Sequence, residues 1–160
     1  MLQTSGNRKG FTLVEMLTAM AIVSVLAMVA VPLAKVTVKR GREIELRRNL
    51  RIIRQALDEY KKMADEKKFE VEEDTEGYPP DLETLVEGIE VSESQEGSEV
   101  TKTVKFLRRI PRDPMTGSYE WGLRSYQDDH DSTSWGGENV FDVYTLSQGI
   151  ALDGTFYREW

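Results

Sequence analysis

The chain has 160 residues, which is enough for one modest domain with an extension, and its formal net charge is −7. Residues 1–54 hold ten lysines and arginines against three glutamates, a net charge of +7, whereas residues 55–160 hold eleven against twenty-five acids, a net charge of −14. The sequence has no cysteine, which excludes a disulfide-stabilised head and a cysteine nucleophile. A small exported domain would therefore depend on packing, partners or a metal.

An apolar segment runs from Phe11 to Ala34, after nine mostly polar residues and Gly10. As a helix it would span roughly 36 Å, which is enough to cross a bilayer with some tilt. A secretory signal peptide or a plain signal anchor would account for a basic start followed by an apolar core. Neither accounts for Glu15, because a carboxylate inside a spanning helix costs about 2.5–3.5 kcal/mol on insertion scales and usually marks function.

The segment RKGFTLVE, from Arg8 to Glu15, resembles the prepilin peptidase recognition sequence of type IV pilins and type II secretion pseudopilins. The resemblance implies cleavage between Gly10 and Phe11, followed by methylation of the new N-terminus at Phe11. Gly10 has no side chain, so a membrane protease can close on the backbone there. Glu15 can pair with the terminal ammonium of a neighbouring subunit, and such a pair would set the axial register of an assembly.

Pro32 matches a proline common in this family, and we expect a kink or a loosened turn there because the ring frees the carbonyl of Met28. A proline that marks the membrane exit is the other interpretation. The resemblance implies a single-pass protein of the bacterial inner membrane, with residues 1–10 as a cytoplasmic leader and the head in the periplasm. The basic residues from Lys35 to Arg42 favour the opposite orientation by the positive-inside rule. We follow the resemblance, since processing requires the Gly10–Phe11 bond on the cytoplasmic side.

Residues 11–34 are thus predicted as the transmembrane and assembly helix, and residues 35–66 continue it as an amphipathic helix. Apolar residues recur there at three- and four-residue spacing: Leu46, Leu50, Ile53, Leu57, Tyr60 and Ala64. We expect this half to pack on a periplasmic head formed by residues 67–160. The basic run from Lys39 to Arg54 lacks interleaved aromatic residues, which argues against nucleic-acid binding.

The head is expected to combine a short helix with a three-stranded antiparallel sheet, which makes the fold class α+β. Prolines and a glycine bound the helix, predicted within Tyr78–Gly88. Residues 89–103 are rich in serine and glutamate and are predicted to form a flexible loop. Three short segments with aromatic or β-branched residues are the predicted strands: Tyr119–Ser125, Phe141–Leu146 and Thr155–Tyr157.

Three head motifs are similar to those of the major pseudopilin (protein G) of type II secretion systems. They are a Tyr-Pro-x-x-Leu start at Tyr78, an Ile-Pro-x-Asp-Pro-x-x-Gly turn from Ile110, and a Phe-Asp-Val-Tyr-Thr-Leu-Ser strand from Phe141. The absence of cysteine agrees with this branch, because many type IV pilins close their C-terminal region with a disulfide.

The resemblance implies a structural subunit of a type II secretion pseudopilus that pushes exoproteins across the outer membrane. The implied partners are further copies of the chain, minor pseudopilins, prepilin peptidase, an inner-membrane platform protein with its cytoplasmic ATPase, and the lipid bilayer. Two alternatives stay open. One is a subunit of a surface type IV pilus for adhesion, motility or DNA uptake. The other is a membrane-anchored binding protein whose aromatic, acidic head captures a ligand.

Major pseudopilins of this type bind calcium between their last two strands, in a loop that corresponds here to Leu146–Gly154. The resemblance implies Asp153 and the carbonyls of Leu146 or Ser147 as ligands, with Asp142 on the preceding strand. Calcium takes about six to eight oxygens. Part of the Asp- and Gly-rich stretch of the family is replaced here by Ile-Ala-Leu, so a plain turn at Asp153 is the other interpretation.

The acidic run Asp128–Asp131 lacks the spacing and the glycine of an EF-hand, so a solvated loop is the simpler interpretation. His130 is the only histidine of the chain. The sequence has no G-x-S-x-G, no H-E-x-x-H and no phosphate-binding glycine loop. We therefore expect no enzymatic activity.

Overall fold

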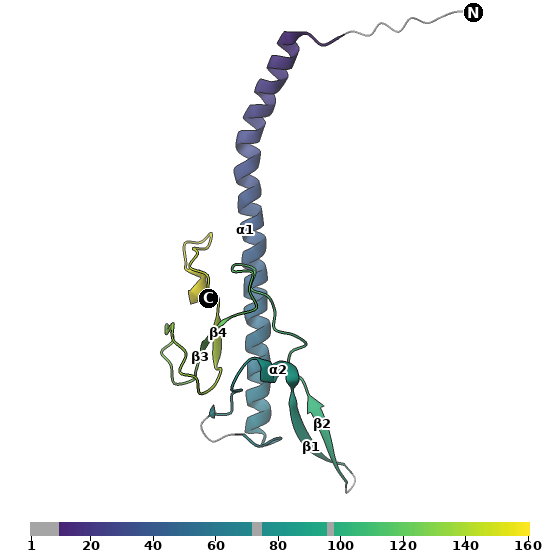
Figure 1. The fold of residues 1–160 in the computed structure, drawn as a ribbon, viewed down its shortest axis with the longest axis vertical. Coiled ribbons are helices and arrows are strands. Elements are labelled where there is room, and N and C mark those ends of the chain that lie inside the picture. The colour runs from purple at the N-terminus through teal and green to yellow at the C-terminus, as the bar shows by residue number, and fades with distance from the viewer. Residues whose placement is uncertain (1–9, 72–74, 96–97) are drawn as a thin grey trace, which may run out of the picture. The chain divides into compact units, whose positions relative to one another are not determined.

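The computed structural model describes residues 10–71, 75–95 and 98–160 (Figure 1). The described elements comprise two α-helices, four strands and one 3-10 helix, so the fold is α+β as predicted. In chain order they are α1 (Leu13–Asp65), α2 (Glu83–Glu87), β1 (Ile89–Gln95), β2 (Ser98–Val104), β3 (Gly122–Arg124), β4 (Asp142–Tyr144) and the 3-10 helix η2 (Tyr157–Glu159). The boundary between two compact units falls within α1, after Lys39.

In the first unit, the apolar half of α1 is exposed along its length. Every residue from Gly10 to Val38 is exposed, and none of the most apolar window of the helix is buried. By length and composition alone the helix could cross a membrane, since that window has a mean hydropathy of 2.4. The helix continues through Pro32, so the proline does not end it.

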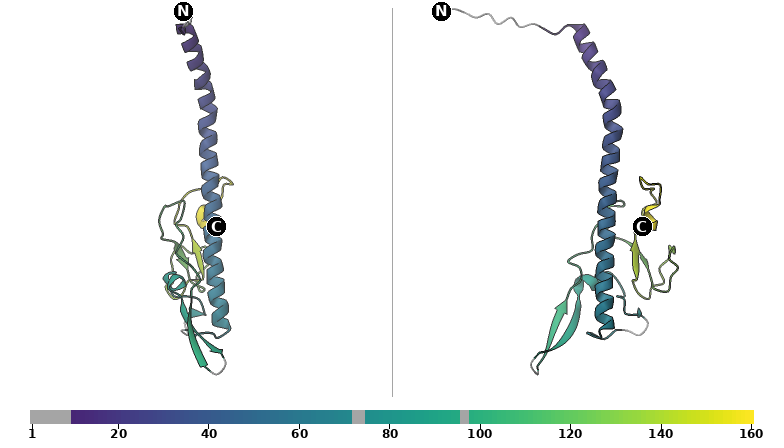
Figure 2. Two further views of the ribbon diagram at one scale, coloured as in Figure 1. Left: turned by 90° about the vertical axis from the view of Figure 1, so that its right-hand side faces the viewer. Right: turned by 180° about the vertical axis from the view of Figure 1, so that it is seen from behind.

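In the second unit, the remainder of α1 buries one face in the core of the head. The buried residues recur at the predicted three- and four-residue spacing: Leu46, Leu50, Ile53, Ala56, Leu57, Tyr60 and Ala64. Facing them in the same core are Leu82, Leu85, Leu107, Trp121, Val140, Val143 and Ala151. The β1–β2 hairpin and the β3–β4 pair flank this half of α1 (Figure 2). Each fully buried leucine contributes about 1.5–3 kcal/mol, so this face holds the head on the helix.

The short helix α2 lies where the sequence predicted it. The carboxylate of Asp81 accepts hydrogen bonds from the backbone N–H of Thr84 (2.8 Å) and from its hydroxyl (2.7 Å), which caps the first turn. Leu85 is fully buried. Gly88 ends the helix at φ +86°, and a Cβ there would lie 2.5 Å from the carbonyl oxygen of Val104, so only glycine fits.

The prediction of a flexible loop at residues 89–103 is wrong. Strands β1 and β2 pair as an antiparallel hairpin, from Ile89 opposite Val104 to Gln95 opposite Ser98. Serines and glutamates suggested a loop, but they are interspersed with β-branched residues that favour strands: Val91, Val100, Thr101, Thr103 and Val104.

The prediction of a three-stranded sheet also needs correction, because the four strands form two separate pairs. Strands β3 and β4 pair antiparallel, from Gly122 opposite Tyr144 to Arg124 opposite Asp142. The third predicted strand, Thr155–Tyr157, contributes only an isolated bridge between Ile150 and Phe156 before the chain enters η2. A three-residue apolar pattern is too short to distinguish a strand from a turn.

The Ile110–Gly117 segment forms the predicted turn around a buried carboxylate. Asp113 is fully buried and accepts hydrogen bonds from the backbone N–H of Met115 (2.8 Å) and the hydroxyl of Thr116 (3.1 Å). It also accepts one from the hydroxyl of Thr145, which directly follows β4. A buried acceptor with three donors is fully satisfied, so this turn is fixed to the β3–β4 pair.

Residues 149–160 are held on α1 by a second buried carboxylate. Glu43 is 9% exposed. Its Oε1 accepts hydrogen bonds from the hydroxyl of Tyr157 (2.8 Å) and from the backbone N–H of Leu152 (2.8 Å). Burial, followed by the hydrogen bond to Glu43, raises the pKa of Tyr157 to about 12.

We expect Tyr157→Phe to lower the free energy of unfolding by about 1–2 kcal/mol at neutral pH, because Glu43 stays buried with one donor fewer. The unfolded tyrosine loses its proton near pH 10.0, whereas the folded one keeps it up to about pH 12. The stabilisation by this hydroxyl is thus complete below pH 10 and is lost as the pH rises through 12. The difference between the variant and the wild type should shrink over that range.

Urea unfolding of the full chain in detergent, repeated at several pH values, measures both effects. Tyr119→Phe is the matched control, because Tyr119 is exposed and its hydroxyl has no hydrogen-bond partner among the described residues. Equal stabilities of the Tyr157 and Tyr119 variants would contradict the role assigned to Glu43.

Candidate functional site

The N-terminus of α1 is capped by a reciprocal pair of hydrogen bonds between Thr12 and Glu15. The hydroxyl of Thr12 accepts from the backbone N–H of Glu15 (3.2 Å), and Oε2 of Glu15 accepts from the backbone N–H of Thr12 (3.0 Å). The Thr12 hydroxyl also donates to the same Oε2 (3.2 Å). This is a capping box, in which two of the unpaired N–H groups at a helix start find partners. The Thr-x-x-Glu spacing shows it in the sequence, and our sequence analysis missed it.

The capping box gives Glu15 a role that does not require a second subunit. A negative charge in the first turn is also favoured by the helix dipole. Because Thr12 follows Phe11 directly, cleavage after Gly10 would place a new ammonium one residue before the cap. A single carboxylate would then lie beside both the helix start and the processed terminus.

The predicted cleavage position is exposed and lies outside the helix. Gly10 and Phe11 are exposed and precede the first helical residue, and a Cβ added at Gly10 would meet no heavy atom within 4 Å. A peptidase can therefore reach the bond between them without unwinding the helix. Pro32, the other predicted assembly residue, lies inside α1 and is exposed.

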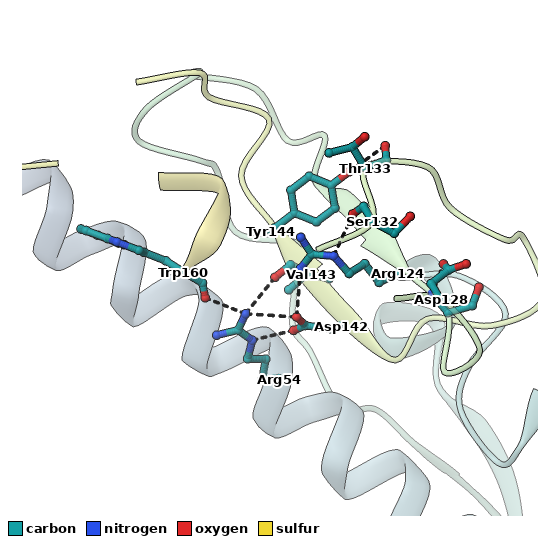
Figure 3. Close-up of polar contacts among 10 residues, drawn as sticks. Arg54, Arg124, Asp128, Ser132, Thr133, Asp142, Val143, Tyr144 and Trp160 are labelled. Atoms are coloured by element: carbon teal, nitrogen blue, oxygen red, sulfur yellow. Dashed lines mark hydrogen bonds and ion pairs between the residues drawn. The ribbon is translucent and has the colours of Figure 1, made fainter. Parts of the chain in front are cut away.

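Asp142, a predicted calcium ligand, pairs with two arginines (Figure 3). Nε of Arg54 lies 2.7 Å from its Oδ1, and Nη1 of Arg124 lies 3.4 Å from its Oδ2. Arg54 also donates to the backbone carbonyls of Val143 (3.2 Å) and Trp160 (2.8 Å). The arginine of the helix thereby joins α1, β4 and the residue after η2 in one cluster.

The second predicted ligand, Asp153, has partners of its own. Its Oδ1 accepts from the hydroxyl (2.7 Å) and the backbone N–H (3.0 Å) of Thr155, and its Oδ2 lies 3.2 Å from Nη2 of Arg47. The hydrogen bonds from Thr155, and then Arg47, hold the pKa of Asp153 below its usual value. Arg47 and Arg54 are seven residues apart on α1, a rise of roughly 10.5 Å, so the two aspartates are held at different levels of the helix.

The other two predicted ligands lie between them in the chain. Leu146 is exposed, and Ser147 donates its backbone N–H to the hydroxyl of Thr145 (3.1 Å). Among the described residues there is no group of three or more acidic or histidine side chains that could hold a metal ion. The side chains present thus fit arginine pairing better than a calcium sphere, and calcium binding stays a prediction.

Calcium bound by Asp142 and Asp153 would raise the Tm of the purified protein in millimolar calcium relative to EDTA. Arginines already pair with both carboxylates, so the same Tm in both solutions would show that they hold this loop without calcium. Magnesium at the same concentration is the control for ionic strength. A rise specific to calcium, and abolished in Asp153→Asn, would show that the ion displaces Arg47 and that the cluster is a metal site.

Comparison with known protein families gives one match, and it lies in the N-terminal part of the chain. Residues 5–31 match the model of the prokaryotic N-terminal methylation motif. No curated protein and no solved structure matches the chain. The matched range includes Gly10, Phe11 and the capping box of Thr12 and Glu15. It supports a type IV pilin-like family and a substrate of prepilin peptidase, and it does not extend to the head.

Proposed function

We propose that this protein is a structural subunit of a type II secretion pseudopilus. In this role prepilin peptidase removes residues 1–10, Phe11 is methylated, and the mature subunit polymerises to push exoproteins across the outer membrane. The observation that carries the proposal is the methylation motif at residues 5–31, which continues into a helix whose apolar residues are all exposed up to Val38.

An exposed apolar surface of this extent requires a nonaqueous environment. The bilayer supplies it before assembly, and the apolar helices of neighbouring subunits supply it within a filament. Small side chains such as Ala27 and Ala30 permit close helix approach. Glu15 favours the filament, because its charge is costly in lipid and is compensated by the terminal ammonium of a neighbour.

Two features favour the secretion pseudopilus over a surface pilus. The motifs at Tyr78, Ile110 and Phe141 are similar to those of major pseudopilins, and each lies in an ordered part of the head. The head also has no disulfide, and its closing contacts are the noncovalent ones of Glu43 and Arg54. A surface type IV pilus is the second candidate, and it is favoured by the same match at residues 5–31.

The capping box allows the charge of Glu15 to be tested apart from its role at the helix start. Glutamine keeps an acceptor for the N–H of Thr12, whereas alanine removes both the acceptor and the charge. We expect Glu15→Gln and Glu15→Ala to be inserted and processed normally, and both to lose most filament assembly. Processing is followed by the gel shift of the leader, and assembly by the yield of sheared filaments.

Normal assembly of Glu15→Gln, with a defect only in Glu15→Ala, would assign Glu15 to capping and contradict the intersubunit pair. Normal assembly of both variants, with a stable monomer in detergent, would favour a membrane-anchored binding protein instead.

Deletion of the gene tests which filament the subunit builds. We expect loss of specific exoproteins from the medium, with surface filaments intact, and recovery when the wild-type gene is restored. The extracellular proteome and the sheared surface fraction are measured on the same cultures. Normal secretion with missing surface filaments would move the protein to the pilus class.

A further inference from the structure

A groove of about 530 Å³ lies on the head between α1 and the segment from Phe106 to Tyr119. Its lining is apolar in part, since Ile52 of α1 is 39% exposed and Tyr119 is 63% exposed. These two side chains give a docking partner apolar surface to cover.

Three of the arginines that line this groove have no partner within the described part of the chain. Arg48 of α1 and the consecutive Arg108 and Arg109 line it and are exposed. None of the three makes a hydrogen bond or ion pair within the described part of the chain. By contrast, Arg47, Arg54 and Arg124 are each paired with an aspartate. Glu45 and the hydrogen-bonded Arg112 also line the groove, so its lining is net positive and suits an acidic occupant that carries apolar side chains.

The loop between β3 and β4 has that composition, and its backbone is fixed. The side-chain oxygen of the fully buried Asn139 accepts from the backbone N–H of Tyr126 (2.9 Å), and its carbonyl accepts from the indole of Trp135 (2.8 Å). Asp128 accepts from the backbone N–H groups of Ser125 (2.7 Å) and Gly136 (3.1 Å). A partner would meet a preorganised surface, which lowers the entropic cost of docking.

The same loop presents charge and aromatic rings outward. Three of its carboxylates are exposed and have no partner among the described residues: Asp129, Asp131 and Glu138. Beside them Tyr126 is 56% exposed and Phe141 is 42% exposed. The Phe141 ring lies edge-on to Tyr126 at 5.4 Å, so the two rings form one platform. Arginines bind such a surface through both ion pairs and cation–π contacts.

We propose that the arginine groove of one copy receives the β3–β4 loop of a second copy. Three unpaired arginines meet three unpaired carboxylates, and exposed apolar side chains lie on both surfaces. No hydrogen bond or ion pair joins the two surfaces within the described chain. A contact between two different patches of identical subunits is heterologous, and it propagates into an open filament unless the rotation closes a ring. The inference rests on the proposed filament function and assigns the contact that joins neighbouring heads.

The absence of native cysteine makes a crosslinking test specific. The full chain carrying both Arg109→Cys and Asp131→Cys is expressed in its cells, oxidised, and analysed without reductant. Both positions are exposed, so neither change removes a core contact. We expect a ladder of dimers, trimers and higher species, which each single cysteine variant lacks. The matched control pairs Asp131→Cys with Arg51→Cys, an exposed arginine that lines a different groove of the head.

The charges are tested in parallel by exchange. Arg109→Asp alone and Asp131→Arg alone should each reduce filament yield, and the double exchange should restore it. Filaments without an Arg109–Asp131 ladder, or with a stronger ladder from Arg51, would overturn this contact and leave the filament function standing. A crosslink that stops at the dimer would also overturn it. Absence of any filament in the wild type would refute both proposals.

Discussion

The structure depends on one helix that meets two different environments. The first half of α1 is apolar on all sides and exposed, and the second half is apolar on one face and buried there in the head. The first half of the helix would be insoluble in water. The second half carries charge on its outer face and would be costly to place in an apolar environment. The core of the head accordingly packs on this single face of α1, from Leu46 to Ala64.

Side chains of α1 also supply the polar contacts that close the head. Glu43, Arg47 and Arg54 all reach residues beyond position 141, through Tyr157, Asp153 and Asp142. Besides Oδ1 of Asp142, Arg54 donates to Oδ2 of the same residue and to the carbonyls of Val143 and Trp160. These hydrogen bonds hold its planar guanidinium in one orientation. These contacts join the last twenty residues of the chain to α1 without a covalent bond.

The sequence predicted the parts of the fold that depend on local pattern. The helix and its buried face were predicted from composition and from the spacing of apolar residues. The cleavage motif was predicted from the eight consecutive residues from Arg8 to Glu15. Two head predictions failed because local cues were ambiguous. The serines at residues 89–103 favoured a loop over the hairpin, and Thr155–Tyr157 was too short to distinguish a strand from an isolated bridge that leads into a 3-10 helix. The pairing of Asp142 with Arg54 joins positions 88 residues apart, and no spacing rule predicts such a contact. The same limit explains why the arginine partners of Asp142 and Asp153 were not predicted from the sequence.

The contacts of Glu43 can form only when the chain is almost complete. The groups that it holds lie 109 and 114 residues further along the chain. During synthesis α1 leaves the ribosome long before Leu152 and Tyr157 are made. Glu43 therefore lacks these two partners until then. This closing contact therefore forms only after nearly the whole chain has been made, and contacts of such long sequence separation are slow to form.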